Sequence, residues 1–302
     1  MPRRARYIRT ILLELERIHS HLLWIGLAHH FIGFDTLFMQ AWRIREPVMW
    51  LTEYLTGNRK TYGMNRIGGV ARDLPDDAHE RIPPVLEKIA DESARAVDAI
   101  LEDASIRARL EGVGTLPTSA AKAYCVAGPT ARGSGVDIDA RRDHPFAAYP
   151  ELDVEVCVEH GCDIWSRTLV RVRELFDSIK LVKQALKQIP SGPVMADFDE
   201  IVPFRVGVSS VEAPRGEVHH YAMTGPGNRP YRWRVRAPSY NNLQSIPALL
   251  KGQSIADAPI SVASLDPCFS CTERIQTVDT TTGEVRIYRQ EDLLSEFRKR
   301  HA

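Results

Sequence analysis

The sequence lacks an apolar run long enough to cross a bilayer, since a membrane-spanning helix needs roughly 20 such residues and a run such as Leu22–Leu27 is far shorter. Its basic start, Met-Pro-Arg-Arg-Ala-Arg, leads into a charged helical pattern rather than into the apolar region of a secretory signal. It also has no surplus of either charge, with 39 basic and 39 acidic residues, so no nucleic-acid partner is indicated. These absences predict a cytoplasmic protein that reaches any membrane through partner subunits.

Cysteine is scarce as well, with five in 302 residues. An odd number in a chain of this length argues against a disulfide framework and for a reducing compartment. The remaining composition, 44% hydrophobic and 26% charged, is that of a globular protein with a sizeable core. The cysteines are therefore expected to be either core residues or metal ligands.

Apolar residues recur at helical spacing over residues 8–25 and 162–188. Start and stop signals predict two more long helices, at 35–57 and at 77–103, where Asp77 opens the helix. Asp35 is expected to cap the second helix, and Pro47 to kink or break it. Residues 128–150 look loop-like because glycine and proline are frequent there.

The pattern shifts to short strands after residue 191. The other expected elements are strands at 204–211, 218–222 and 231–235, helices at 105–111, 242–250 and 290–300, and a strand-like segment after 274. The predicted fold class is mainly α with a small β-containing C-terminal part (α+β). The predicted division is a helical bundle at 1–190, an α+β region at 191–274 and a tail at 275–302.

The sharpest chemical motif is Asp266-Pro-Cys268-Phe-Ser-Cys271-Thr-Glu-Arg274. Two cysteines three positions apart place both thiolates on one side of a tight turn, where they can bind one metal ion, and Arg274 favours the thiolate form. A thiolate-only site needs about four ligands, and the other cysteines form no second C-x-x-C pair. The pair therefore predicts half of a metal site, with two core cysteines, or a zinc-stabilised interaction protein that adds histidines, as the alternatives.

The second motif is Glu212-Ala-Pro-Arg215-Gly-Glu217. An arginine on a Pro–Gly turn beside a strand is held stiffly and can direct its guanidinium into a pocket, where it would stabilise an anion or a bound gas ligand. A surface turn with a salt bridge is the default interpretation of the same residues.

Together these motifs resemble the large subunit of group 4 nickel–iron hydrogenases, the membrane-bound, energy-converting type that includes the formate hydrogenlyase large subunit. The resemblance covers nearly the whole chain, with further matching segments at residues 6–26, 34–75, 128–149 and 229–243. The same framework recurs in the 49-kDa, quinone-site subunit of respiratory complex I. That relative lacks the metal-binding cysteines, so Cys268 and Cys271 favour the hydrogenase side.

The resemblance implies a nickel–iron centre held by four cysteines, with cyanide and carbon monoxide on the iron. Cys268 would be a terminal nickel ligand and Cys271 would bridge nickel and iron. Arg215 would lie over the open metal position and orient the gas, and Asp266 would be a partner of Arg215 and of the cluster. The implied activity is heterolytic cleavage of H2, or its reverse.

The resemblance also implies partners. Electrons would pass to an iron–sulfur small subunit, and membrane subunits would hold the assembly on the inner face of the cell membrane. A maturation endopeptidase would cut after Arg274, which would make residues 275–302 a cleavable extension and 191–274 the metal-site region.

The sequence departs from the family in one respect. The family's other two cysteines lie in an Arg-x-Cys-Gly-x-Cys motif upstream of the first long helix. This sequence does not contain that motif. Three explanations are open: a missing upstream segment, two polypeptides that reassemble, or a non-catalytic scaffold like the 49-kDa subunit of complex I. We expect the first, because the cysteine pair, Arg215 and the tail are all intact.

Overall fold

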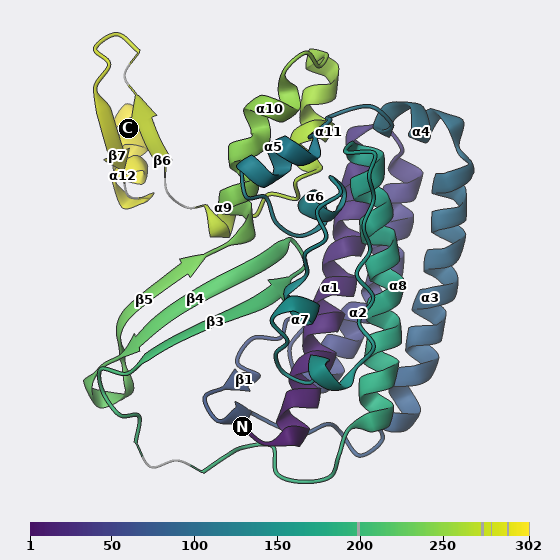
Figure 1. The fold of residues 1–302 in the computed structure, drawn as a ribbon, viewed down its shortest axis with the longest axis vertical. Helices are drawn as coiled ribbons and strands as arrows, with labels where there is room; N and C mark the ends of the chain where they lie inside the picture. The colour runs from purple at the N-terminus through teal and green to yellow at the C-terminus, as the bar shows by residue number, and fades with distance from the viewer. Residues whose placement is uncertain (198–199, 273–274, 279, 289, 302) are drawn as a thin grey trace.

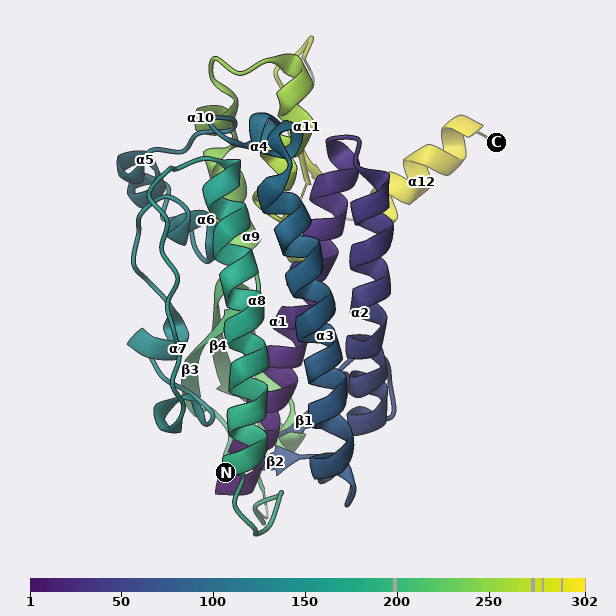
Figure 2. The same ribbon diagram turned by 90° about the vertical axis from the view of Figure 1, so that its right-hand side faces the viewer.

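The computed structural model describes all residues except 198–199, 273–274, 279, 289 and 302. Its main body is a bundle of four long helices that lie side by side (Figures 1 and 2). These helices are α1 (Arg3–Phe31), α2 (Asp35–Thr56), α3 (Ala78–Glu102) and α8 (Ile164–Gln188). All four were predicted from the sequence, α1 and α8 from apolar periodicity and α2 and α3 from their start and stop signals.

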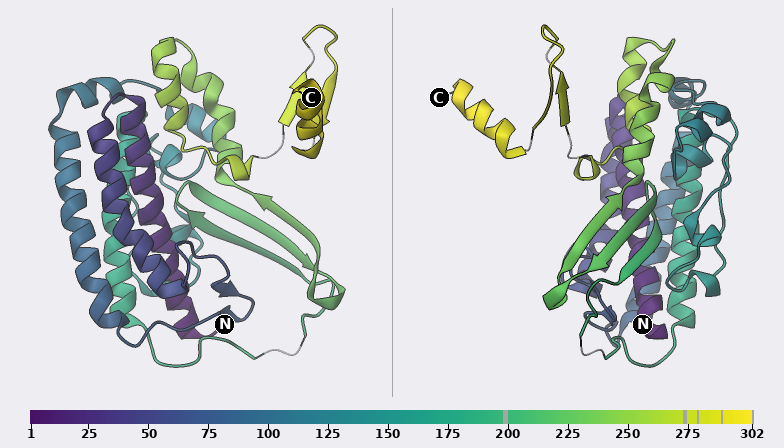
Figure 3. Two further views of the ribbon diagram at one scale, coloured as in Figure 1. Left: turned by 180° about the vertical axis from the view of Figure 1, so that it is seen from behind. Right: turned by 60° about the vertical axis from the view of Figure 1, so that its left-hand side comes forward.

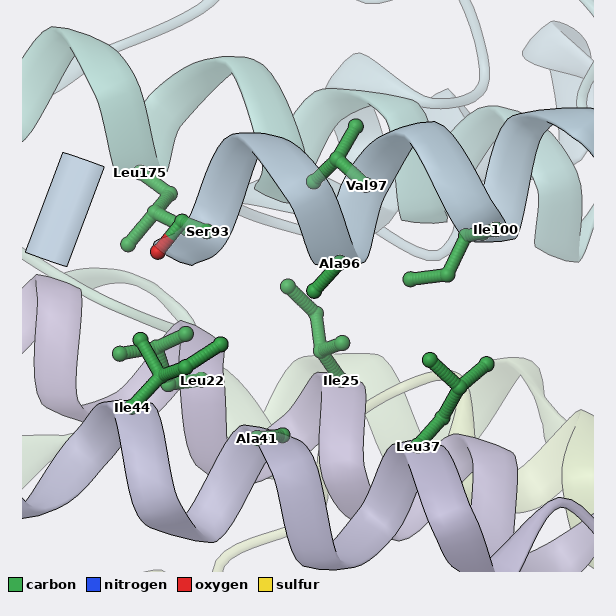
Figure 4. Close-up of a pocket in the computed structure, with 10 residues that line it drawn as sticks. All are labelled: Leu22, Ile25, Leu37, Ala41, Ile44, Ser93, Ala96, Val97, Ile100 and Leu175. Carbon is green, nitrogen blue, oxygen red and sulfur yellow. The ribbon is translucent and has the colours of Figure 1, made fainter. Parts of the chain in front are cut away.

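Helix α1 is the centre of the bundle because its side chains are buried on most of its circumference. It packs along both α2 and α8, and α3 packs against α2 and α8. Figure 4 shows Leu22 and Ile25 of α1 facing apolar side chains of the other three helices across a small gap. Burying each such leucine or isoleucine contributes roughly 1.5–3 kcal/mol, so this apolar contact fixes the helices.

Helix α2 differs from the prediction at two places. It begins after Phe34, and the Asp35 carboxylate accepts a hydrogen bond from His30 Nδ1 at 2.6 Å instead of capping the helix. It also continues through Pro47 to Thr56 without a break. Proline removes one backbone donor, but the buried face of α2 packs on the bundle on both sides of Pro47 and holds the helix together.

Shorter elements connect the long helices. Helix α4 (Ala104–Leu110) was predicted. The next three helices were not, because they lie in or near loop-rich sequence and are too short to show an apolar period. The unpredicted elements are α5 (Thr118–Ala123), α6 (Pro129–Arg132), α7 (Ala140–Asp143), β1 (Asn65–Arg66) and β2 (Gly69–Val70).

A three-stranded antiparallel sheet follows the bundle in the chain. Its order is β3-β4-β5, from β3 (Val206–Ala213), β4 (Gly216–Thr224) and β5 (Pro230–Arg236), as predicted. Ala213 pairs with Gly216, so a two-residue turn joins β3 to β4. The end of the sheet with this turn lies against the bundle, and the other end extends away from it (Figure 1).

The helix expected at 242–250 is instead three consecutive turns of helix. They are α9 (Pro238–Asn242), a 3-10 turn (Leu243–Ser245) and α10 (Ile246–Leu250), followed by α11 (Ala258–Ala263). Pro247 has no N–H to donate to the preceding turn, which explains the interruption.

The tail forms a hairpin of β6 (Ile275–Val278) and β7 (Val285–Tyr288) and then α12 (Gln290–His301), which stand apart from the bundle in Figure 3. The mainly α fold with a small β-containing C-terminal part is confirmed. Its division into three parts stays a prediction. None of the described helices combines the length and the apolar character that a bilayer crossing requires.

Candidate metal site at the end of the bundle

The segment that leads into the cysteine pair is anchored on two helices of the bundle. Trp24 Nε1 of α1 donates to the Ala263 carbonyl at 2.8 Å. From α8, Arg167 Nε donates to Ser264 Oγ at 3.0 Å and Arg171 Nη2 to the Ser264 carbonyl at 2.9 Å. The Arg171 guanidinium also lies 4.0 Å from the centre of the Trp24 ring, a favourable cation–π contact. Long side chains of α1 and α8 therefore fix the position of Ala263 and Ser264, just before Asp266.

Asp266 lies next in the chain, with its backbone in the left-handed region at φ 52°. Its carboxylate Oδ1 is 3.0 Å from Arg215 Nη2, and its carbonyl accepts from Arg215 Nε at 2.8 Å. Asp266 is only 8% exposed, and within the described part of the chain its Oδ2 has no hydrogen-bond partner. A buried acceptor without a donor is costly, so Oδ2 is suited to a donor from another group.

Arg215 is positioned by the backbone that lies under its turn. Gly128 has φ 63°, and a Cβ on it would lie 2.5 Å from the Arg215 carbonyl oxygen. Asn242 of α9 clamps the same region, because its Oδ1 accepts from Ala127 N at 2.8 Å and its Nδ2 donates to the Ala127 carbonyl at 3.3 Å. The turn can approach the bundle this closely only because residue 128 has no side chain.

The strand before the turn is held by a buried carboxylate, Glu212. Its Oε1 accepts from Arg132 Nη1 at 3.0 Å and its Oε2 from Ala140 N at 3.0 Å. Arg17 Nη2 of α1 donates to the Glu212 carbonyl at 2.7 Å. Burial raises the pKa of Glu212 although Arg132 opposes the shift. These contacts tie the hairpin that carries Arg215 to α1 and α6.

Arg132 joins this hairpin to α8 through a second carboxylate. Arg132 Nε donates to Glu174 Oε1 at 2.7 Å, and His21 Nε2 lies 2.9 Å from Glu174 Oε2. Burial alone would raise the pKa of Glu174, but Arg132 and His21 outweigh it and hold this pKa well below its usual range. Further buried members of this charge network are Glu14, Arg17, Asp139, Arg141 and Tyr149.

The two cysteines follow Asp266 on a 3-10 turn. Cys268 N donates to Ser239 Oγ at 3.1 Å, and Cys271 N donates to the Cys268 carbonyl at 3.0 Å. Both cysteines are half-buried and free of disulfide bonds. Burial, together with a hydrogen bond to Cys268, raises the pKa of the Cys271 thiol to about 11, although Arg215 acts in the opposite direction. Cys271 is therefore in the thiol form near neutral pH, and a metal cation bound there would have to displace its proton.

The donor set fits half of a metal centre. Two thiolates suit nickel, zinc or iron, but nowhere in the described residues do three or more His, Cys, Asp or Glu side chains gather as ligands. Cys125, Cys157 and Cys162 accordingly do not complete the pair. The predicted processing residue Arg274 lies outside the described residues.

A cavity of about 350 Å³ opens beside the pair, with Cys268 and Arg215 among the residues that line it. His19 and Lys60 are among the lining residues that were not predicted from the sequence. His19 is one of four histidines in the first helix, where the sequence alone indicates packing. His21 and His29 are buried, and His21 contacts Glu174.

The family of this chain is shown by its similarity to known proteins. Residues 32–208 and 201–274 match the family described as respiratory-chain NADH dehydrogenase, 49 Kd subunit. The chain belongs to this family, as its motifs predicted.

Its relatives include both hydrogenases and complex I subunits. It is 42% identical over 293 residues to formate hydrogenlyase subunit 5 of Escherichia coli, covering 97% of this chain and 52% of the relative. It is 37% identical over 310 residues to the membrane-bound hydrogenase subunit alpha of Pyrococcus furiosus, covering 97% of this chain and 72% of the relative. It is 34% identical over 293 residues to an NADH-quinone oxidoreductase subunit of Geotalea uraniireducens, covering 88% of this chain and 75% of the relative. The chain thus spans about half the length of the first of these relatives.

Replacing Gly128 by alanine tests the close approach under the Arg215 turn. Gly112 is the matched control, because it also has a positive φ, of 70°, but a Cβ there would meet no atom within 4 Å. Both variants carry the cost of a left-handed backbone, and only Gly128→Ala adds a backbone clash. We expect urea unfolding to show a loss of stability that is larger in Gly128→Ala by about 2 kcal/mol or more. Equal losses would contradict the proposed contact.

A second prediction concerns Asp177, which lies at the edge of the buried charge network. Its Oδ2 is 3.6 Å from Arg141 Nη1, and burial raises its pKa to about 7. The folded protein therefore binds a proton here that the unfolded chain releases near pH 4, so stability falls as the pH rises from about 4 to about 7. We expect Asp177→Asn to raise the free energy of unfolding at pH 8 by roughly 1–4 kcal/mol.

The advantage of Asp177→Asn should shrink steadily on acidification and vanish near pH 4. Urea unfolding of both proteins at a series of pH values measures it. A difference between the two proteins that does not change with pH would show that the Asp177 carboxyl titrates normally.

Proposed function

We propose that this chain is a nickel–iron hydrogenase large subunit in a complex I-like, membrane-associated assembly, where it oxidises H2 or reduces protons. The observation that carries the proposal is the contact of Arg215 with both the carbonyl and the carboxylate of Asp266, two residues before Cys268. Arg215 and Cys268 line one cavity, so a rigid cation and a thiolate ligand meet at the same place.

Each residue has a defined part in the proposal. Cys268 and Cys271 supply two thiolates to the metal centre, and two more would come from a Cys-Gly-x-Cys segment within the same assembly. Asp266 fixes the Arg215 guanidinium, whose planar set of donors can then orient a small ligand in the cavity. When bound, the nickel–iron centre would supply the heterolytic cleavage of H2.

The proposed assembly follows from what the relatives are named for. Formate hydrogenlyase subunit 5 and a membrane-bound hydrogenase subunit are among them, which supports a membrane-associated assembly of several subunits. In this proposal an iron–sulfur small subunit is the electron partner. Membrane subunits would hold the chain peripherally on the inner face of the cell membrane. A maturation endopeptidase would remove residues 275–302 by cutting after Arg274.

A second function is supported by the incomplete donor set. The described residues offer no group of three metal ligands, and the chain is also similar to a subunit of NADH-quinone oxidoreductase. In this alternative the chain is a non-catalytic scaffold or quinone-site subunit, and the cysteine pair binds no nickel.

Nickel analysis of the native assembly distinguishes the two functions. We expect about one nickel per chain in the assembly purified with the wild-type chain and in Cys125→Ser, because Cys125 is exposed and outside the pair. Cys268→Ser and Cys271→Ser should each lose nickel and hydrogen uptake while the subunits stay assembled. If the wild-type assembly holds no nickel, or Cys268→Ser retains it, the hydrogenase proposal is wrong.

A further inference from the structure

The cavity beside Cys268 has a second chemical feature, at the end formed by α1 and the loop after α2. It is an open cavity of about 350 Å³. It is lined by Glu16, His19, Ser20, Leu23, Thr52, Arg59, Lys60, Thr61, Tyr62, Pro214, Arg215 and Cys268.

His19 contacts two cations: Lys60, which lines the cavity, and Arg45, which is not among the lining residues. Its Nε2 lies 2.5 Å from Arg45 Nη2 and 2.8 Å from Lys60 Nζ. Burial, with smaller contributions from the nearby cations Arg45, Lys60 and Arg215, lowers the pKa of His19 to about 3. His19 is therefore neutral at physiological pH, and its Nε2 accepts hydrogen bonds from two cationic groups.

The other charges of the cavity are already matched. Arg59 forms a two-bonded ion pair with Glu46, at 2.7 and 2.8 Å, and Arg215 pairs with Asp266. The carboxylate of Glu16 accepts a hydrogen bond from Thr61. It raises the pKa of Lys60, but by less than Arg45 lowers it.

Arg45 and Lys60 are not matched in this way. Lys60 lies close to another cation, and both burial and Arg45 lower its pKa. Arg45 donates to a neutral imidazole, and its buried Nε has no hydrogen-bond partner within the described part of the chain. At the His19 end of the cavity, two cationic groups thus converge on one acceptor, His19 Nε2, which is uncharged.

We propose that the His19 end of this cavity binds a small oxyanion, of carboxylate, bicarbonate or phosphate type, with Lys60 as its charged donor and Arg45 adding positive charge next to His19. Such an ion would supply the negative charge that His19 cannot, and its oxygens can accept charge-assisted hydrogen bonds from Lys60. The site uses only residues of this chain and does not depend on a bound metal.

Calorimetric titration of the 302-residue chain tests the site. Acetate, bicarbonate and inorganic phosphate are titrated separately at constant ionic strength, with chloride as the reference anion. The wild-type chain should bind at least one of the three oxyanions saturably, with one site, and more tightly than chloride. Binding of no oxyanion above the chloride reference overturns the proposal.

Variants locate the site. Lys60→Gln should weaken binding about tenfold or more, the effect of losing one charge-assisted hydrogen bond, and Arg45→Gln should weaken it by less, because Arg45 adds charge without lining the cavity. Lys183→Gln is the matched control, because Lys183 forms a surface ion pair with Glu87 on the helical bundle and should bind like the wild type. Equal affinity in all four proteins would place the anion elsewhere and refute the assignment.

Thiol labelling provides a test that does not depend on the variants folding. Cys268 lines the cavity, so a bound anion should slow its alkylation, followed site by site with mass spectrometry. Exposed Cys125 is the internal reference and should react at an unchanged rate. Saturating oxyanion that leaves the Cys268 rate unchanged relative to Cys125 counts against the site.

Discussion

Arg132 lies fully buried between three carboxylates, with Glu174 at 2.7 Å, Glu212 at 3.0 Å and Asp139 at 3.5 Å. A buried guanidinium without partners would cost several kcal/mol, so the elements packed around Arg132 have to supply its carboxylate partners. Glu174 comes from α8, Asp139 from the start of α7 and Glu212 from β3. This one side chain therefore determines where the sheet meets the helical bundle.

The candidate site depends on that position. Glu212 lies three residues before Arg215 on the same hairpin, so the ion pair at the strand also places the guanidinium at the turn. From the other side, α1 and α8 fix the segment before Asp266 through Trp24 and Arg171. Two separately anchored segments thus converge at the contact of Arg215 with Asp266, and the cysteines follow directly in the chain. Such support is what a site with precise ligand geometry needs.

The sequence predicts the parts of this structure that obey a local rule. The long helices follow from apolar periodicity and from their start and stop signals, and the cysteine pair and the Arg215 turn from the spacing of their residues. It does not reveal that charged residues such as Arg132 and Glu174 are buried, because at helical spacing they look like solvated positions until their partners are known. His19 was missed for the same reason, since its partners Arg45 and Lys60 lie 26 and 41 residues away.

A double-mutant cycle between Arg132 and Glu212 tests the central claim most directly. Glu212→Leu removes one of the three carboxylates around the buried Arg132, and Arg132→Met leaves these carboxylates without their shared cation, so each should cost about 3–5 kcal/mol in the free energy of unfolding. The double variant removes both charges, so we expect it to be more stable than the sum of the two losses by about 2 kcal/mol or more. Losses that add to within about 0.5 kcal/mol would show that this ion pair does not hold the sheet to the bundle.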